Sequence, residues 1–159
     1  MLICKQKYID DETKGEHEEH MKILYTAEAT AHGGREGKVQ SSDGNLVANL
    51  RVPKEMGGPG GEGTNPEQLF AAGYAACFQS ALMLIARRQH VDASQSSVTA
   101  KVGIGPTEGG AYGLDVELHV AIPGVDAATG EKLVEGAHKV CPYSNATRGN
   151  IPVRLVFEQ

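Results

Sequence analysis

The chain has 159 residues, of which 40% are hydrophobic and 22% charged, and its formal net charge at pH 7 is −5. This length suits about one domain, and the hydrophobic content supports a compact core rather than disorder. The sequence is acidic overall and has no cluster of Lys and Arg residues of the kind that binds nucleic acid. We therefore expect no nucleic-acid partner. The three cysteines show no CxxC spacing, which excludes a zinc knuckle or a thioredoxin motif.

The first twenty residues differ in character from the rest of the chain. They hold three lysines and six acidic residues, and therefore carry −3 of the net charge. We predict an N-terminal extension over residues 1–20, disordered or not native to the domain, and a single domain over 21–159. The opening Met-Leu-Ile-Cys is too short for the apolar region of a signal peptide, and no apolar run approaches the roughly 18 residues of a membrane span. We therefore expect a cytoplasmic protein without a membrane partner.

The chain from residue 21 onward begins with segments of strand-like composition. Strands are predicted over residues 22–31, 37–42 and 45–52. The last two are separated by Asp43 and Gly44, a pair that favours the positive φ angles of a two-residue hairpin turn. A loop over 53–63 follows, with five Gly and two Pro, and we expect it to be exposed.

The clearest predicted element is a long helix over residues 64–88. Its start has two interpretations, because Thr64 and Glu67 have the spacing of a capping box, whereas Asn65 can cap a helix that has Pro66 at its first position. Apolar residues then occupy nearly every face, and a helix that is apolar all round is buried. A small domain buries such a helix by wrapping a sheet around it or by sharing it with a second subunit.

The remaining sequence alternates again between strand and helix patterns. Strands are predicted over residues 96–104, 112–122 and 150–157. A second helix fits 127–140, with one apolar stripe, and Pro142 ends it. The order βββ-α-ββ-α-β predicts an α+β fold with mainly antiparallel strands.

Two short patterns resemble ligand-binding motifs but lack the surroundings that such motifs need. Residues 58–63 match GxGxxG, yet the preceding strand ends near Val52 and no ribose-binding acid follows at the usual distance. His17 and His20 are three positions apart, whereas the histidines of a zincin helix are four apart. We therefore expect neither a nucleotide cofactor nor a metal.

Cys77 and Cys141 are the candidate reactive groups of the domain. Cys77 lies in the middle of the long helix, and three of its four neighbours at i±3 and i±4 are small. Both thiols also suit a purely structural role, since free cysteine is among the most buried residue types. If they react, Cys141 is the resolving thiol, because it lies at a helix C-terminus, where the helix dipole disfavours a thiolate.

A reactive Cys77 needs a nearby cation, because an apolar site raises the pKa of a thiol. Arg35, on a glycine-rich loop, is the candidate, and an arginine drawn into an apolar site needs a carboxylate partner such as Glu67. Glu67 and Cys77 are ten residues apart, however, which is about 15 Å along a straight helix. Either Arg35 spans much of that gap, or a two-fold dimer brings Glu67 of one chain near Cys77 of the other.

Three segments resemble those of a known family. Residues 64–78 (TNPEQLFAAGYAACF) are similar to the central helix of the organic hydroperoxide resistance proteins, a branch of the osmotically inducible protein C superfamily. Residues 141–150 (CPYSNATRGN) resemble the second cysteine segment of that branch, and residues 29–37 (ATAHGGREG) resemble its arginine segment. The resemblance covers residues 21–159, and members of the branch usually begin near the position of Met21.

The resemblance implies an intertwined homodimer in which antiparallel sheets wrap around long buried central helices. It also implies a cysteine-based peroxidase without metal, haem or flavin, in which Cys77 is the peroxidatic thiol and Cys141 the resolving thiol. Arg35 would hold the thiolate and the peroxide, and Glu67 would hold Arg35.

The same resemblance implies a substrate and a reductant. The expected substrates are lipophilic organic hydroperoxides, which suit the apolar flanks of Cys77. The expected reductant is a dithiol such as a lipoylated protein or dihydrolipoamide. The alternative is a non-catalytic redox-sensing or lipophile-binding module that uses the same thiol pair.

Overall fold

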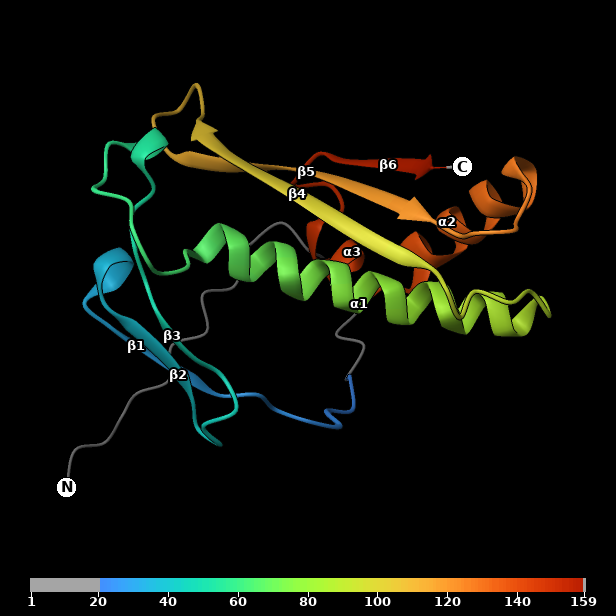
Figure 1. Ribbon diagram of the computed structural model, residues 1–159, viewed down its shortest axis with the longest axis horizontal. Helices are drawn as coiled ribbons and strands as arrows, with labels where there is room; N and C mark the ends of the chain where they lie inside the picture. Colours follow the sequence, from blue (N-terminus) through green and yellow to red (C-terminus); the bar gives the residue numbers. More distant parts are fainter. Residues whose placement is uncertain (1–20, 159) are drawn as a thin grey trace.

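The computed structural model describes residues 21–158, which form two three-stranded sheets and three α-helices (Figure 1). The predicted N-terminal extension, residues 1–20 with Cys4, lies outside the described residues. The strands are β1 (Ala29–His32), β2 (Lys38–Ser41), β3 (Val47–Asn49), β4 (Ser97–Pro106), β5 (Tyr112–Ala121) and β6 (Val153–Glu158). The helices are α1 (Pro66–Arg88), α2 (Ala127–Val140) and α3 (Pro142–Thr147), and two short 3₁₀ turns are η1 (Gly34–Glu36) and η2 (Lys54–Met56).

The N-terminal sheet is an antiparallel meander of β1, β2 and β3. The predicted hairpin is confirmed, and the Asp43 carboxylate accepts the backbone N–H of Asn45. The predicted two-residue turn is wrong, because only Gly44 of the pair has a positive φ, 74°, and the Ser41 N–H donates to the Leu46 carbonyl across a longer loop. The predicted strand over 22–31 is wrong for most of its length, because regular pairing begins only at Ala29. Strand propensity is expressed only where a partner strand supplies hydrogen bonds, and within the described residues none pairs with 21–27.

The second sheet has the order β4-β5-β6 and carries the core. Strands β4 and β5 are antiparallel and β5 and β6 are parallel, as the α-helical crossover between them requires. On β5 the buried side chains alternate with partly exposed ones, and Val116, Leu118 and Val120 face inward. The predicted α+β order is confirmed, and the sheet is mixed rather than purely antiparallel.

Helix α1 lies against this second sheet on one side only. Figure 1 shows β4, β5 and β6 over one side of α1 and the β1–β3 sheet extending away from its other side. Five of its 23 residues are buried, namely Tyr74, Phe78, Ala81, Leu82 and Ala86. The face that points away from the sheet includes Met83 and Leu84, which are 42% and 39% exposed. A single chain therefore buries only part of the helix that the sequence predicts to be buried.

Helix α1 also corrects the expectation that no segment is long and apolar enough to cross a membrane. Among the described residues it is the one helix that qualifies, with a mean hydropathy of 1.7 over 18 residues. Length and composition alone do not distinguish a membrane span from the central helix of a folded core. Here the buried residues of α1 pack against the second sheet and α2, in one hydrophobic cluster.

The second predicted helix is confirmed as α2, which Asp126 caps by accepting the backbone N–H of Thr129. Pro142 ends α2 as predicted, but it also begins α3, which the sequence analysis missed. Proline suits the first position of a helix, because its missing N–H would have no intrahelical partner there. Cys141 therefore lies at the junction of two helices, both preceding and following a helical segment.

Candidate functional site

The two candidate thiols lie side by side in the fold. Cys77 is at the middle of α1 and Cys141 is fully buried at the junction of α2 and α3. Their Sγ atoms are 3.6 Å apart, close enough for a thiol–thiol hydrogen bond, and both cysteines are free thiols. The packing of α1 against α2 and α3 thus joins residues that are 64 positions apart in the sequence.

The surroundings of Cys77 favour its neutral form within a single chain. Burial is the main cause that raises the pKa of the Cys77 thiol, and the neighbouring Cys141 raises it further. The backbone N–H of Tyr143 at the start of α3 acts in the opposite direction, because its hydrogen bond stabilises a thiolate. Activation of Cys77 therefore needs positive charge beyond what its own surroundings supply.

The predicted cation and carboxylate form a second pair in the same chain. The Arg35 guanidinium donates to both carboxylate oxygens of Glu67, with Nη1 to Oε2 at 2.8 Å and Nη2 to Oε1 at 2.6 Å. This hydrogen bonding holds the pKa of Glu67 below its usual range, although burial opposes it. Such bidentate pairs fix a guanidinium in one orientation.

The loop that carries Arg35 depends on glycine. Gly33 and Gly34 have φ angles of 76° and 55°, in the left-handed region that glycine adopts without strain. A Cβ atom on Gly37 would lie 1.7 Å from the carbonyl oxygen of His32, so the backbone at these two residues approaches too closely to accommodate a side chain at position 37. These glycines let η1 present Arg35 at the first turn of α1.

The start of α1 settles the two interpretations of its cap. Asn65 is the cap, and its side chain accepts the backbone N–H of Gln68 at 2.8 Å, with Pro66 as the first helical residue. The Thr64–Glu67 capping box is wrong, because the Glu67 carboxylate is committed to Arg35 and the Thr64 hydroxyl donates to the Gln68 side chain.

The structure therefore brings the four predicted residues together as two pairs. Among the described residues, the Arg35 guanidinium hydrogen-bonds to Glu67, whereas Cys77 contacts Cys141 and the Tyr143 backbone. Glu67 and Cys77 remain ten residues apart on α1, which is about 15 Å along the helix.

Three buried hydroxyl groups beside the thiols escaped the sequence analysis. The Tyr74 hydroxyl is 2.9 Å from Ser144 Oγ and 3.1 Å from Thr147 Oγ1. The Tyr143 ring packs beside Tyr74 and over Gly73, where a Cβ atom would lie 2.9 Å from the Tyr143 hydroxyl. The sequence signal for this group is the polar run Tyr-Ser-Asn-Ala-Thr-Arg at residues 143–148, which follows Pro142 at the start of α3.

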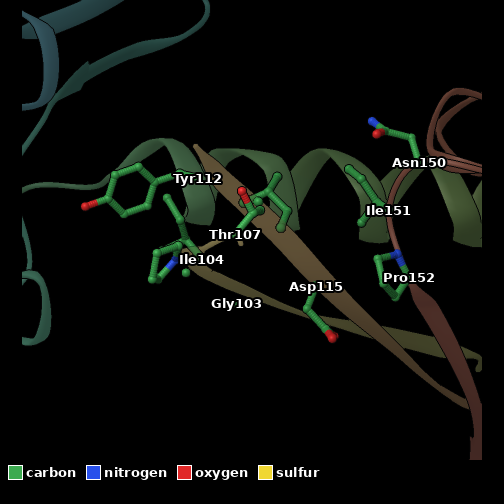
Figure 2. Close-up of a pocket in the computed structure, with 12 residues that line it drawn as sticks. Gly103, Ile104, Thr107, Tyr112, Asp115, Asn150, Ile151 and Pro152 are labelled. Carbon is green, nitrogen blue, oxygen red and sulfur yellow. The ribbon is translucent and has the colours of Figure 1, made fainter. Parts of the chain in front are cut away.

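One cavity is lined by residues other than the two cysteines. It has a volume of about 750 Å³, and Figure 2 shows Thr107 and Tyr112 from the β4–β5 end opposite Asn150, Ile151 and Pro152. A second cavity of about 420 Å³ has the Glu67 side chain at its wall, with an otherwise largely apolar lining. That lining is formed by Pro53, Glu55, Met56, Asn65, Glu67, Gln68, Ala71, Ala100, Val102 and Ile104.

The chemistry of the described residues is that of two thiols and an arginine–carboxylate pair. Residues 21–158 contain no cluster of three or more His, Cys, Asp or Glu side chains that could hold a metal ion. A thiol pair within disulfide reach can pass between reduced and oxidised forms with little backbone movement. A bidentate arginine keeps N–H groups available for an anion.

Comparison with known proteins agrees with this fold. A family model described as OsmC-like protein matches residues 58–156, which is more than half of the chain. The chain therefore belongs to the OsmC-like protein family.

Similar proteins identify the branch of that family. The organic hydroperoxide resistance protein of Xanthomonas axonopodis pv. citri is 57% identical over 137 residues, covering 86% of this chain and 96% of that protein. The organic hydroperoxide resistance protein OhrA of Bacillus subtilis is 51% identical over 137 residues, covering 83% of this chain and 94% of that protein.

A solved structure agrees with these relatives. The crystal structure of an organic hydroperoxide resistance protein from Elizabethkingia anophelis, with crystallant-derived thiocyanate bound, matches with a TM-score of 0.83 at 54% identity. The match covers 87% of this chain and 99% of that one. The predicted branch is confirmed, and these homologues support a role in organic hydroperoxide resistance.

Proposed function

We propose that the chain is a thiol peroxidase that reduces lipophilic organic hydroperoxides to alcohols, with Cys77 as the peroxidatic thiol. The observation that carries this proposal is the 3.6 Å separation of the Cys77 and Cys141 sulfurs. A disulfide bond requires the sulfurs to approach by only about 1.5 Å more. The names of the similar proteins support the substrate class.

The proposed cycle begins at the Cys77 sulfur. The thiolate attacks the terminal peroxide oxygen, an S–O bond forms as the O–O bond breaks, and the alkoxide leaves and takes up a proton as an alcohol. The Cys141 sulfur then attacks the sulfenic acid, an S–S bond forms, and hydroxide leaves with the Cys141 proton as water. A dithiol reduces the Cys77–Cys141 disulfide to two thiols and is itself oxidised to a disulfide.

Arg35 is proposed to supply the positive charge that Cys77 needs. Burial raises the pKa of Cys77, and an adjacent guanidinium would favour the thiolate that attacks the peroxide. Glu67 orients Arg35 through two hydrogen bonds, which leaves the other N–H groups of the guanidinium free for the thiolate and the peroxide.

A second copy of the chain is proposed to complete the site. The face of α1 that points away from the second sheet is largely apolar or small, with Ala72, Ala76, Ser80, Met83 and Leu84 exposed. Two chains that place these faces together would bury both helices, and the β1–β3 sheets would wrap around the pair. Such a homodimer would let the Arg35–Glu67 pair of one chain reach Cys77 of the other.

Subunit mixing tests the shared site. Glu67→Ala chains and Cys77→Ser chains are unfolded together, refolded and assayed, with each variant refolded alone as control. A shared site predicts recovery of about one quarter of wild-type activity, because half of the dimers are mixed and each has one intact site. Activity no higher than the sum of the two controls would contradict it.

The proposed reductant is a dithiol, with dihydrolipoamide or a lipoylated protein as the class to test first. The reduced wild-type protein should consume many equivalents of an alkyl hydroperoxide when dihydrolipoamide is present. Cys77→Ser should abolish this turnover, whereas Cys4→Ser should leave it unchanged.

The alternative is a non-catalytic redox-sensing or lipophile-binding module that uses the same thiol pair. Such a module would oxidise once, in proportion to protein, and would not be recycled by any dithiol. Stoichiometric oxidation without recycling by dihydrolipoamide, lipoylated protein or thioredoxin-type dithiols would therefore favour this alternative over the peroxidase.

A further inference from the structure

Helix α3 is joined to α1 by a buried group of three hydroxyls, which we call the hydroxyl clamp: Tyr74, Ser144 and Thr147. Tyr74 and Ser144 are fully buried and Thr147 is 3% exposed. The Tyr74 hydroxyl lies 2.9 Å from Ser144 Oγ and 3.1 Å from Thr147 Oγ1. Buried hydroxyls that are all paired hold the groups they join in one geometry, because an unpaired one is costly.

The clamp connects the two turns that carry the sulfurs. Tyr74 lies one turn before Cys77 on α1, and Ser144 lies three residues after Cys141 on α3. The Cys141 carbonyl accepts the backbone N–H of Asn145 at 3.0 Å, so the position of Cys141 follows that of the first turn of α3. Thr147 Oγ1 also donates to the Tyr143 carbonyl at 3.0 Å and thereby ties the clamp to the same turn.

Arg148 also links α2 to α3 at their junction. Its guanidinium donates to the His138 carbonyl at 2.8 Å and to the Asn145 side chain at 2.8 Å. The first bond satisfies a carbonyl at the C-terminal end of α2, and the second bridges to α3. The polar run that follows Cys141 therefore has a common structural role, which is to fix the junction that holds the second sulfur.

We propose that the Tyr74–Ser144–Thr147 hydroxyl clamp is the positioning device that holds Cys141 at the Cys77 sulfur, and that it controls the fate of the oxidised enzyme. This inference rests on the proposed peroxidase function. The three hydroxyls bond to one another and to the Tyr143 carbonyl rather than to either sulfur, so they act through the placement of Cys141.

The clamp matters because a Cys77 sulfenic acid has two competing fates. In the productive one, Cys141 attacks it, the S–S bond forms and water leaves. In the damaging one, a second hydroperoxide transfers its terminal oxygen to the sulfenate, which becomes a sulfinate as a second alcohol leaves. A Cys141 that is held in place favours the first fate over the second.

Hydroxyl deletion with little change of shape tests the clamp. The variants are Tyr74→Phe and Thr147→Val, and Thr147→Ser restores a hydroxyl. Reduced proteins receive excess tert-butyl hydroperoxide without reductant, and mass spectrometry measures the ratio of Cys77 sulfinate to Cys77–Cys141 disulfide. We expect this ratio to rise about two- to tenfold in Tyr74→Phe and Thr147→Val, and to return toward the wild-type value in Thr147→Ser.

Two control variants separate positioning from general stability. Val120→Ala lowers stability by opening space in the core at β5 without removing a hydroxyl, and Tyr112→Phe removes an exposed hydroxyl. Neither should change the ratio. If the sulfinate-to-disulfide ratio is unchanged in Tyr74→Phe and Thr147→Val, or if Val120→Ala raises it equally, the proposed role of the clamp is overturned.

A measurement without peroxide distinguishes failure of the clamp from failure of the peroxidase proposal. Diamide oxidises two thiols to a disulfide and is itself reduced to the hydrazine, so it reports how readily Cys77 and Cys141 pair. The clamp predicts that the rate of this disulfide formation falls about two- to tenfold in Tyr74→Phe and Thr147→Val, whether or not the wild-type protein reduces hydroperoxides. Equal rates in all variants would overturn the clamp even if the peroxidase assay succeeds.

Discussion

Arg35 and Glu67 form a bidentate ion pair within one chain, across 32 positions of sequence. The pair links the loop between β1 and β2 to the first turn of α1, and the Arg35 side chain is 36% exposed whereas the Glu67 side chain is 12% exposed. The carboxylate is thus shielded and the cation faces outward. This arrangement suits a guanidinium that Glu67 holds in place and that can still bind a second group.

Loss of either member of this pair should slow the attack of Cys77 on the peroxide. Charge-assisted hydrogen bonds contribute about 1.5–3 kcal/mol, so Glu67→Gln should lower the rate of sulfenic acid formation by about ten- to a hundredfold. Arg35→Lys keeps the positive charge but loses the planar guanidinium that donates two hydrogen bonds to Glu67, so it should also slow sulfenic acid formation. Stopped-flow oxidation with cumene hydroperoxide measures this rate, and Glu62→Gln in the exposed loop is the matched control. Wild-type rates in both site variants would contradict the assigned roles.

Gly37 should be essential for activity but not for the core. An alanine Cβ there would meet the His32 carbonyl oxygen at 1.7 Å, so the loop that presents Arg35 must rearrange. The core cluster contains no residue of the β1–β3 sheet, so the free energy of unfolding should change little. We expect Gly37→Ala to lose most hydroperoxide turnover while its urea unfolding midpoint stays nearly unchanged. Gly109→Ala is the control, because a Cβ atom there would meet no atom within 4 Å, and it should keep the wild-type turnover and midpoint. Full activity of Gly37→Ala would show that the loop has no such constraint.

The face of α1 that is exposed in a single chain should be a dimer contact. Leu84→Glu places a charge on that face, and burial of an unpaired charge would prevent two chains from associating. We expect this variant to be monomeric by light scattering and to lose turnover, while Gln95→Glu in the exposed connection before β4 behaves as the wild type. An active, monomeric Leu84→Glu protein would contradict the shared site.

Local patterns were sufficient to predict most of the fold. Asp43-Gly44, Asn65-Pro66 and the apolar run of α1 each act through neighbours in sequence, and the hairpin and helices form where these signals predict. The strand predicted over 22–31 is wrong for most of its length. A strand depends on a partner strand, which can lie anywhere in the chain or in another chain. Helix α3 was missed because one proline both ends α2 and begins the next helix.

The candidate site was predictable in its residues but not in its geometry. The sequence pointed to Cys77, Cys141, Arg35 and Glu67, and it identified the ten-residue gap on α1 as a problem. The hydroxyl clamp could not be predicted, because Tyr74 and Ser144 are polar residues whose pairing depends on how α1 and α3 pack. Tertiary contacts between distant segments determine which hydroxyl finds which partner.

His119 should give the protein a pH-dependent stability that is independent of the thiols. Its ring lies 2.9 Å from Glu117 and 2.8 Å from Glu158, and these hydrogen bonds raise the pKa of His119, while Lys101 opposes them. The same cluster, with Arg154, lowers the pKa of Glu117 to about 2. The group links β5 to the parallel strand β6.

The direction of this pH dependence follows from the raised pKa of His119 in the folded state. The stabilisation is fully present below the unfolded-state pKa of about 6.5, and it is lost as the pH rises through the higher folded-state value. Urea unfolding at about pH 6 and about pH 8.5 should therefore show a fall in stability that His119→Asn reduces. Identical pH slopes for the two proteins would contradict this contribution.

Peptide mass spectrometry under non-reducing conditions shows whether Cys77 and Cys141 form the catalytic disulfide. The reduced wild-type protein receives one equivalent of cumene hydroperoxide and is digested after the thiols are blocked. We expect one alcohol to be released and one disulfide to join Cys77 to Cys141. Unmodified Cys77, or a disulfide that joins Cys77 to Cys4 instead, would contradict it.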